Sequence, residues 1–211
     1  MNIKKKKLSN IIIPNKKINY FVITVLLFGV ISGSIFLIIL NETDKNNTIL
    51  QIQNFITNLN NNTINNGLAL KNSLIINYLF IFLIWGLGLS IIGIIINIFL
   101  TYIKGFIIGF SLSSIFLTYK YKGLLMAITY IFPSQLLNII IVCILTIYSI
   151  MFSLNLLEII IKKRINKHNH FLKKYIIILL FSIIISFISS IIEVYMFPNI
   201  LKAIINIYLK S

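Results

Sequence analysis

LIINYLFIFLIWGLGLSIIGIIINIFLTYIKGFIIGFSLSSIFLT, residues 74–118, is a run of 45 residues in which Lys104 is the only charged side chain. As one α-helix it would be about 68 Å long, at about 1.5 Å per residue. The hydrocarbon core of a bilayer is only about 30 Å thick. The run must therefore turn back on itself as two membrane-spanning helices, over about 74–96 and 99–118. We expect the turn near Lys104, on the cytoplasmic side.

Three further apolar blocks, at 20–40, 124–161 and 175–197, are also long enough to cross a bilayer. Hydrophobic residues make up 58% of the 211-residue chain and charged residues 11%. A soluble all-helical core is the competing interpretation, but soluble domains carry about 25% charged residues. We predict an all-α, polytopic integral membrane protein of about five transmembrane helices, over 20–40, 74–96, 99–118, 136–158 and 175–197.

The basic residues are concentrated in two short segments. Residues 1–19 hold six lysines, and residues 162–174 hold five lysines and Arg164, within a net charge of +15. Such segments beside membrane spans are typically cytoplasmic, which places the N-terminus inside and the C-terminus outside. Nucleic-acid binding is the rival explanation of the charge, but no aromatic residues are interleaved to support it. The first apolar block is too long for a signal-peptide core, which favours an uncleaved anchor.

Two amphipathic segments are expected on the extracytoplasmic side. The polar loop 41–73 has no positive bias, and it carries apolar residues at helical spacing: Ile49, Ile52, Phe55, Ile56 and Leu59. Such a helix could pack on the bundle, lie on the membrane or receive a partner. Residues 198–211 alternate apolar and polar faces and predict an interfacial C-terminal helix.

Small residues mark the expected helix–helix interfaces. Gly105, Gly109 and Ser113 recur four apart in one predicted span. The span before it carries Trp85, Gly86, Gly88, Ser90 and Gly93. The first span carries a G-x-x-x-G at 29–33. Small side chains let helix backbones approach closely within a membrane. We therefore expect this part of the chain to form a tightly packed interface.

The motif FPSQ, residues 132–135, interrupts the block 124–161. Pro133 lacks an N–H group and disfavours helix in the residue before it. We expect a half-helix over 124–131, a break, and then a full span that begins beyond Gln135. Irregular backbone at membrane depth requires protein or water around it, so this break is a candidate functional or assembly feature. A simple kink is the alternative.

No convincing catalytic motif occurs in the sequence, so we expect neither enzyme activity nor a cofactor. The single cysteine, Cys143, lies in an apolar block, and His168 and His170 lie in a basic loop, so no metal site is expected either. Among the four acidic residues, Glu158 is four residues before Lys162, which explains it as a helical ion pair.

Glu193 is the one acidic residue that remains inside an apolar run. It is preceded on one helix face by four serines, and Pro198 follows it at the start of the next element; the serines are Ser182, Ser186, Ser189 and Ser190. We expect this face to turn into the bundle or toward a partner helix. The lysines expected on the same side, Lys120, Lys122 and Lys202, are its candidate partners, whereas Lys104 is expected on the opposite side.

Four segments together resemble the stage II sporulation protein M family, SpoIIM. They are FIFLIWGLGLSIIG (80–93), FLTYIKGFIIGF (99–110), YKGLLMAITYIFPSQ (121–135) and IIEVYMFPNILKAI (191–204). The resemblance covers most of residues 17–209. It singles out a set of structural or partner-contact residues: Trp85, Gly86, Lys104, Gly105, Gly109, Pro133, Gln135, Glu193 and Pro198.

The resemblance implies a role in endospore formation. Members of this family act in engulfment of the forespore, in the mother-cell septal membrane, where they localise the peptidoglycan-degrading stage II sporulation proteins P and D. The M protein itself is not the hydrolase. A broader set of bacterial membrane proteins shares the domain without a link to sporulation. A membrane subunit of a transporter or permease is the alternative function, which the expected break at Pro133 and the buried Glu193 suggest.

Overall fold

The computed structural model describes residues 16–127, 132–162 and 168–208, and these are helical apart from short turns. Five helices in this part of the chain are long and apolar enough to cross a membrane, which confirms the predicted fold class. Their ranges are Lys16–Ile39, Asn66–Gly88, Gly93–Gly123, Gln135–Ile161 and Phe171–Ala203. Helices suit this environment because each satisfies its backbone hydrogen bonds internally.

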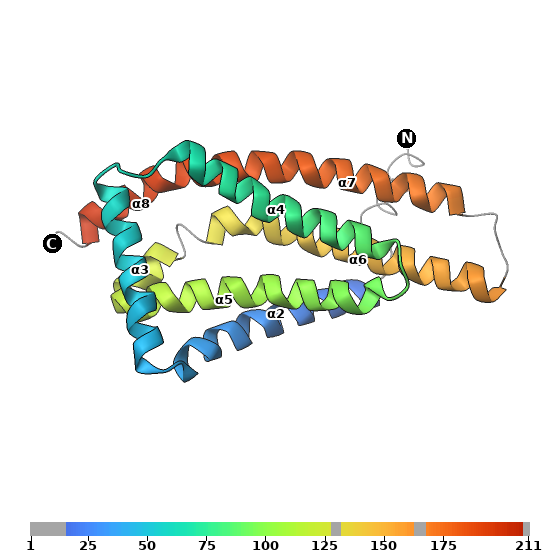
Figure 1. Ribbon diagram of the computed structural model, residues 1–211, viewed down its shortest axis with the longest axis horizontal. Coiled ribbons are helices and arrows are strands. Elements are labelled where there is room, and N and C mark those ends of the chain that lie inside the picture. Colours follow the sequence, from blue (N-terminus) through green and yellow to red (C-terminus); the bar gives the residue numbers. More distant parts are fainter. Residues whose placement is uncertain (1–15, 128–131, 163–167, 209–211) are drawn as a thin grey trace.

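The long helices run along the bundle in alternating directions (Figure 1). The long helices are α2 (Lys16–Ile39), α4 (Asn66–Gly88), α5 (Gly93–Met126), α6 (Phe132–Lys162) and α7 (His168–Ile191). Helix α3 (Glu42–Asn60) connects α2 to α4, and a π-helical turn η2 (Ile192–Met196) joins α7 to α8 (Phe197–Tyr208). The α4–α5 turn, the end of α6 and the start of α7 lie at one end of the bundle, and α3 and α8 lie at the other (Figure 1).

The turn between α4 and α5 falls at residues 89–92, so the expectation of a turn near Lys104 was wrong. The Ser90 hydroxyl accepts a bond from the Gly93 N–H at 3.2 Å and so caps the new helix. From α6, the Ser153 hydroxyl donates to the carbonyl oxygens of Gly88 and Ser90, at 2.8 and 2.9 Å. A cap and a cross-helix donor, rather than the isolated charge, therefore set the position of the turn.

Helices α2 and α5 pack with their backbones in contact. A Cβ atom added to Gly29 or Gly33 would lie 2.3 or 2.1 Å from a carbonyl oxygen of α5. One added to Gly105 or Gly109 would lie 2.3 or 2.0 Å from a carbonyl oxygen of α2. The G-x-x-x-G of the first span thus faces the glycine stripe of α5, in agreement with the predicted small-residue interface.

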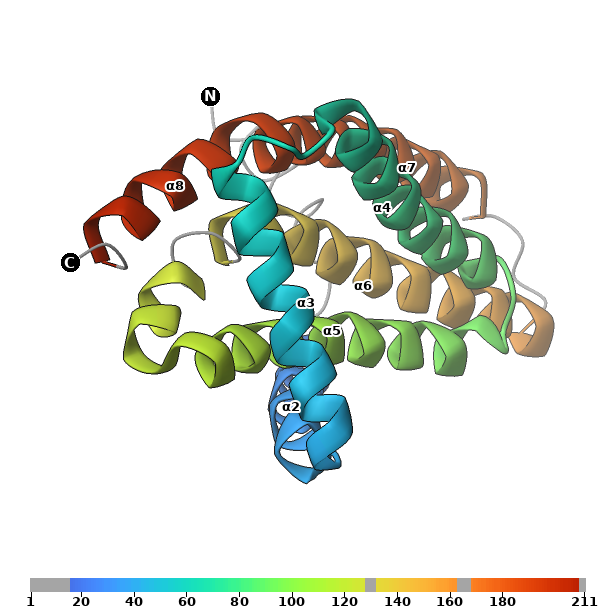
Figure 2. The same cartoon turned by 60° about the vertical axis from the view of Figure 1, so that its left-hand side comes forward.

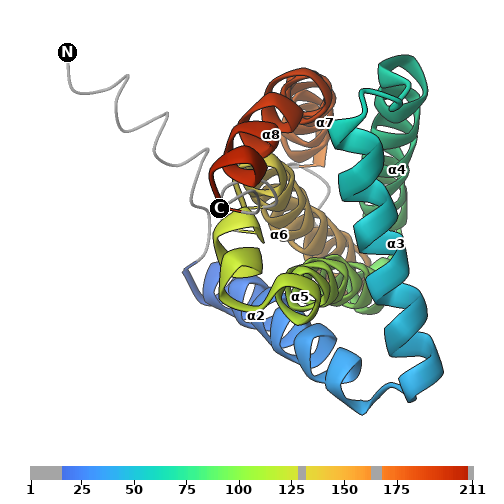
Figure 3. The same ribbon diagram turned by 90° about the vertical axis from the view of Figure 1, so that its left-hand side faces the viewer.

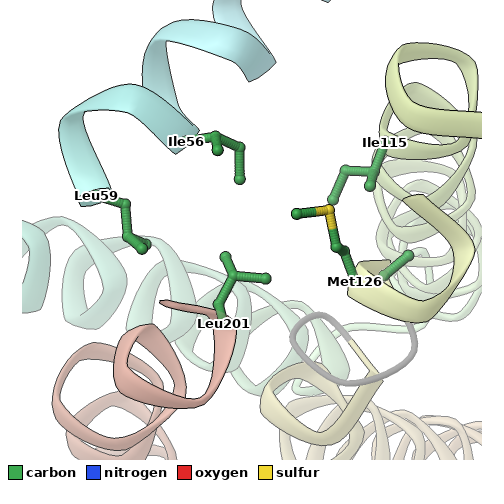
Figure 4. Packing of buried hydrophobic residues seen from close by; sticks show 6 residues of the cluster. Ile56, Leu59, Ile115, Met126 and Leu201 are labelled. Carbon is green, nitrogen blue, oxygen red and sulfur yellow. The ribbon is translucent and has the colours of Figure 1, made fainter. Parts of the chain in front are cut away.

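The predicted amphipathic helix of the 41–73 loop is α3, and it packs on the bundle. Figures 2 and 3 show it crossing the end of the bundle near α5 and α8. Its buried residues Ile56 and Leu59 join a hydrophobic cluster with Ile115, Met126 and Leu201, drawn in Figure 4. The cluster thereby ties α3 to α5 and α8, three segments that are far apart in the sequence.

Helix α5 changes direction at Lys120, which has a positive φ of 50°. After it, Gly123 lies against the chain it has just left, since an added Cβ would be 2.4 Å from the Ile115 carbonyl oxygen. Of the predicted half-helix 124–131, residues 128–131 lie outside the described part of the chain. Pro133 stands in the first turn of α6, where a missing N–H costs no helical bond. Pro133 therefore belongs to a helix start.

Candidate functional site

Glu193 lies in the π-helical turn η2, directly after α7. π-Helical turns are rare and are frequent at functional sites. The serine face that leads up to this turn is buried as expected, since Ser182, Ser186, Ser189 and Ser190 are each at most 3% exposed. The face therefore turns into the bundle, and Glu193 continues it toward the end that carries α3.

The Glu193 carboxylate is held by donors from two other helices. Ser73 of α4 donates its hydroxyl to Oε2 at 2.9 Å, and Gln135 of α6 donates its amide to Oε1 at 3.1 Å. The Asn77 amide donates to Ser190 at 3.3 Å and extends the network along α4 and α7. Charged hydrogen bonds of this kind are among the stronger ones in proteins. Glu193 therefore connects η2 to α4 and α6.

Lys104 lies on the same side as Glu193, which corrects the expectation that the two were too far apart to interact. It is only 5% exposed, and the two residues interact electrostatically. Its Nζ atom lies 5.2 Å from the centroid of the Phe80 ring. Because the turn precedes Gly93, Lys104 is about 16 Å into α5 at about 1.5 Å per residue, and not at a helix end. The lysine is thus carried into the bundle interior.

The three lysines predicted to pair with Glu193 lie elsewhere or make other contacts. Lys202 donates a hydrogen bond to the Asn62 side chain in the loop after α3. Lys120 occupies the kink of α5. Lys122 is exposed, after that kink. The kink at Lys120 redirects the chain that carries Lys122, and the order of charges in the sequence does not predict such a kink.

Two cavities meet at Glu193. The outer cavity, of about 400 Å³, lies between α3, the start of α4 and η2, and its lining includes Asn62, Ser73, Glu193 and Lys202. The lateral cavity, of about 390 Å³, lies between α4 and α5 beneath α3, and its lining includes Ser73, Lys104, Gln135 and Glu193. Phe55 of α3 lines both cavities, so α3 covers the Glu193 site from the end of the bundle.

A second buried polar network near the α4–α5 turn was not predicted. The Asn97 amide donates to the Ile84 carbonyl oxygen at 3.1 Å and to the Ser149 hydroxyl. The hydroxyls of Thr101 and Thr146 lie 2.9 Å apart. One sequence feature could have predicted this network, namely the polar residues inside an otherwise apolar run. Such residues face a helix partner when they lie within a membrane.

Trp85 and Gly86 have different surroundings. The Trp85 ring stacks on Tyr175, with centroids 5.6 Å apart, and the Tyr175 hydroxyl donates to the Trp85 carbonyl oxygen at 2.7 Å. An added Cβ on Gly86 would meet nothing within 4 Å, whereas one on Gly88 would lie 2.1 Å from the Ser149 hydroxyl. Gly88, not Gly86, is therefore the glycine that this interface requires.

The remaining predicted residues have the following places. Gly105 and Gly109 form the contact with α2. Pro198 stands in the first turn of α8 and lines the outer cavity. Within residues 16–127, 132–162 and 168–208, no group of three His, Cys, Asp or Glu side chains could hold a metal ion. These contacts hold helices together, and the buried Glu193 carboxylate can accept hydrogen bonds.

Comparison with known proteins gives one match. The family model described as "SpoIIM: Stage II sporulation protein M" matches residues 22–198, which is most of the chain. It includes Glu193, Lys104, Gln135 and both faces of the α2–α5 glycine contact. No curated protein and no solved structure matches the chain.

Proposed function

This chain belongs to the stage II sporulation protein M family, and on that basis we propose that it is a membrane scaffold of the engulfment machinery in an endospore-forming bacterium. In this role it sits in the mother-cell septal membrane. There it localises the peptidoglycan-degrading stage II sporulation proteins P and D, and it performs no hydrolysis itself. The family match over residues 22–198 is the observation that carries the proposal.

The arrangement of charge supports the orientation that this role needs. Helix α2 begins at Lys16, and α7 begins at His168, shortly before Lys173 and Lys174. The positive-inside rule assigns segments of this kind to the cytoplasm. The opposite end, with α3 and α8, then faces the cell wall, where peptidoglycan-degrading partners act.

The packing at that end supports a docking role for α3. Only Ile56 and Leu59 of this helix are buried, and they fix it to the bundle through the cluster shown in Figure 4. Its other face is exposed, and this includes Leu50, which is 54% exposed. We propose that the exposed face of α3, which is held rigidly across the end of the bundle, receives the partner proteins.

Co-purification tests the scaffold role directly. The tagged full-length chain is extracted in mild detergent from sporulating cells, and the bound P and D proteins are quantified. We expect both to be retained, and we expect deletion of the gene to stop engulfment. The Leu50→Glu variant, which alters the exposed face, should lose the partners, whereas Lys71→Gln on α4 should keep them. The scaffold role is wrong if neither partner associates and engulfment completes without the gene.

A transporter or permease subunit is the second candidate, and the cavities at Glu193 favour it. A buried carboxylate and a buried ammonium within a membrane are frequent on substrate or ion pathways. The Glu193→Gln variant separates the two functions. A transporter should lose pH-dependent flux in proteoliposomes and still assemble. A scaffold should show no flux in either form and should change only in stability or partner retention.

A further inference from the structure

Two side chains on the outer surface of the bundle border the lateral cavity. Ile76 of α4 and Ile107 of α5 both line it, and they are 54% and 46% exposed on the outside of the bundle. Helices α4 and α5 are joined at residues 89–92 and diverge from there toward the end that carries α3 (Figure 1). Because exposed isoleucines on membrane-spanning helices face lipid, this side of the cavity lies against the acyl chains of the bilayer.

Two opposite charges lie inside the lateral cavity. Lys104 and Glu193 both line it and interact electrostatically. A buried charge within a membrane is costly and usually marks a function. The pair is neutral as a whole, so the cavity favours a ligand that also carries both charges and has no net charge.

The two groups retain hydrogen-bonding capacity. A carboxylate accepts about four bonds, and Glu193 uses two of these for Ser73 and Gln135. A lysine ammonium has three donors, and the residues that the structure describes form no hydrogen bond with the Nζ atom of Lys104, which faces the Phe80 ring. The lysine can therefore bind an anionic group, and the glutamate an ammonium.

We propose that the lateral cavity binds the head group of a membrane lipid that carries both a primary ammonium and a phosphate. The phosphate pairs with Lys104 and the ammonium donates to Glu193. The acyl chains leave through the mouth between Ile76 and Ile107. The volume of about 390 Å³ lies within the range of about 300–1,000 Å³ that is typical of ligand sites.

The walls favour a lipid over a water-soluble zwitterion. Apolar side chains from three helices contribute to the lining of the cavity: Ile52, Phe55, Ile76, Phe80, Ile107 and Ile108. Such walls stabilise acyl chains, since burying each methylene contributes about 0.8 kcal/mol. A small soluble zwitterion would leave most of this surface without a partner.

Lipid retention by the purified full-length chain tests the proposal. The protein in detergent is mixed with equal amounts of phosphatidylethanolamine, phosphatidylcholine and phosphatidylglycerol with matched acyl chains, and bound lipid is counted by native mass spectrometry. We expect phosphatidylethanolamine to be retained about tenfold more than either of the others, which corresponds to about 1.4 kcal/mol. Phosphatidylcholine has no N–H to donate to Glu193, and phosphatidylglycerol has no ammonium.

Three variants connect the retention to this cavity. Lys104→Gln and Glu193→Gln should each reduce phosphatidylethanolamine retention about tenfold, and Ile107→Trp should do so by closing the mouth. Lys71→Gln, an exposed lysine of α4, should leave retention unchanged. Should Lys104→Gln fail to fold, Ile107→Trp carries the test, because its side chain lies at the lipid-facing mouth.

Three results would overturn the proposal. The first is equal retention of the three lipids. The second is retention that the Ile107→Trp and Glu193→Gln variants leave unchanged. The third is displacement of the bound lipid by millimolar O-phosphoethanolamine, which would assign the site to a soluble zwitterion. None of these results bears on co-purification of the sporulation proteins, so the scaffold role is tested independently.

Discussion

Replacing Gly109 by alanine should separate α2 from α5. The new Cβ would lie 2.0 Å from the Val30 carbonyl oxygen, and ordinary van der Waals contact begins at 3.4 Å, so the backbones must move apart by 1.4 Å. The obstacle is backbone and not the end of a flexible side chain, so no rotamer change relieves it. The same shift stretches two bonds across the interface, from Ser32 to the Tyr102 hydroxyl at 2.8 Å and from Ser34 to the Gly109 carbonyl at 3.2 Å.

The expected loss of stability follows from these contacts. Overpacking of a tight interface costs about 1–3 kcal/mol, and an interhelical hydrogen bond within a membrane contributes about 0.6 kcal/mol on average. Alanine also favours the helix over glycine by about 0.5–1 kcal/mol, which offsets part of the cost. We expect a net destabilisation of about 1–3 kcal/mol, measured as a lower midpoint in SDS titrations followed by far-UV circular dichroism.

Gly86→Ala is the matched control, because its added Cβ meets nothing within 4 Å. It changes the same residue type in a neighbouring long helix, and it should leave the midpoint unchanged or raise it. Equal midpoints for Gly109→Ala and the native chain would refute the close backbone contact. Equal destabilisation by Gly109→Ala and Gly86→Ala would show that the loss of stability does not come from α2–α5 packing.

Three other variants test the remaining contacts. Ser153→Ala should lower stability by about 1 kcal/mol in the same titration, because it removes both hydroxyl bonds to the α4–α5 turn. Tyr175→Phe should shift the emission of Trp85, the single tryptophan of the chain, because it removes the hydroxyl bond to the carbonyl of that residue. Leu59→Ala should loosen α3 by about 2–5 kcal/mol and speed its cleavage by protease added to the purified chain in detergent, whereas Leu50→Ala should leave cleavage unchanged.

A serine of α5 provides the control for Ser153→Ala. Ser111→Ala removes only a bond within α5, to the Ile107 carbonyl oxygen, and should have little effect on the SDS midpoint. An unchanged midpoint for Ser153→Ala would mean that the turn does not need the hydroxyl. Unaltered emission from Tyr175→Phe would contradict the hydroxyl bond to the Trp85 carbonyl, and unaltered cleavage of Leu59→Ala would contradict the docking of α3.

Part of this structure could be predicted from the local sequence pattern. The length of the uncharged run 74–118 requires two spans, because no single helix of that length fits a bilayer. Spacing by four placed Gly105 and Gly109 on one face, and the same rule placed Ser182, Ser186 and Ser190 on another. These are properties of one helix at a time, and periodicity is sufficient to predict them.

The site at Glu193 could be predicted from the sequence only in part. That the carboxylate ends a buried serine face follows from helical spacing. Its donors Ser73 and Gln135 come from helices 120 and 58 residues away in the chain. No local pattern pairs such distant residues. Because the turn was predicted at the wrong position, Lys104 was placed on the other side of the membrane. Its proximity to Glu193 was therefore not predicted.

The sequence by itself determined that the chain is all-helical, crosses a membrane about five times and has glycine and serine faces to bury, because hydrophobic length and helical periodicity depend only on neighbouring residues. Tertiary structure decided which faces meet. It placed the glycines of α2 against those of α5, Lys104 near Glu193, and α3 over the cavities beside them. The physical reason is that the position of each turn fixes the depth of every residue after it. A local cap at Ser90 and a donor from Ser153, which is 65 residues from the Gly88 carbonyl that it bonds, hold the turn at that position here.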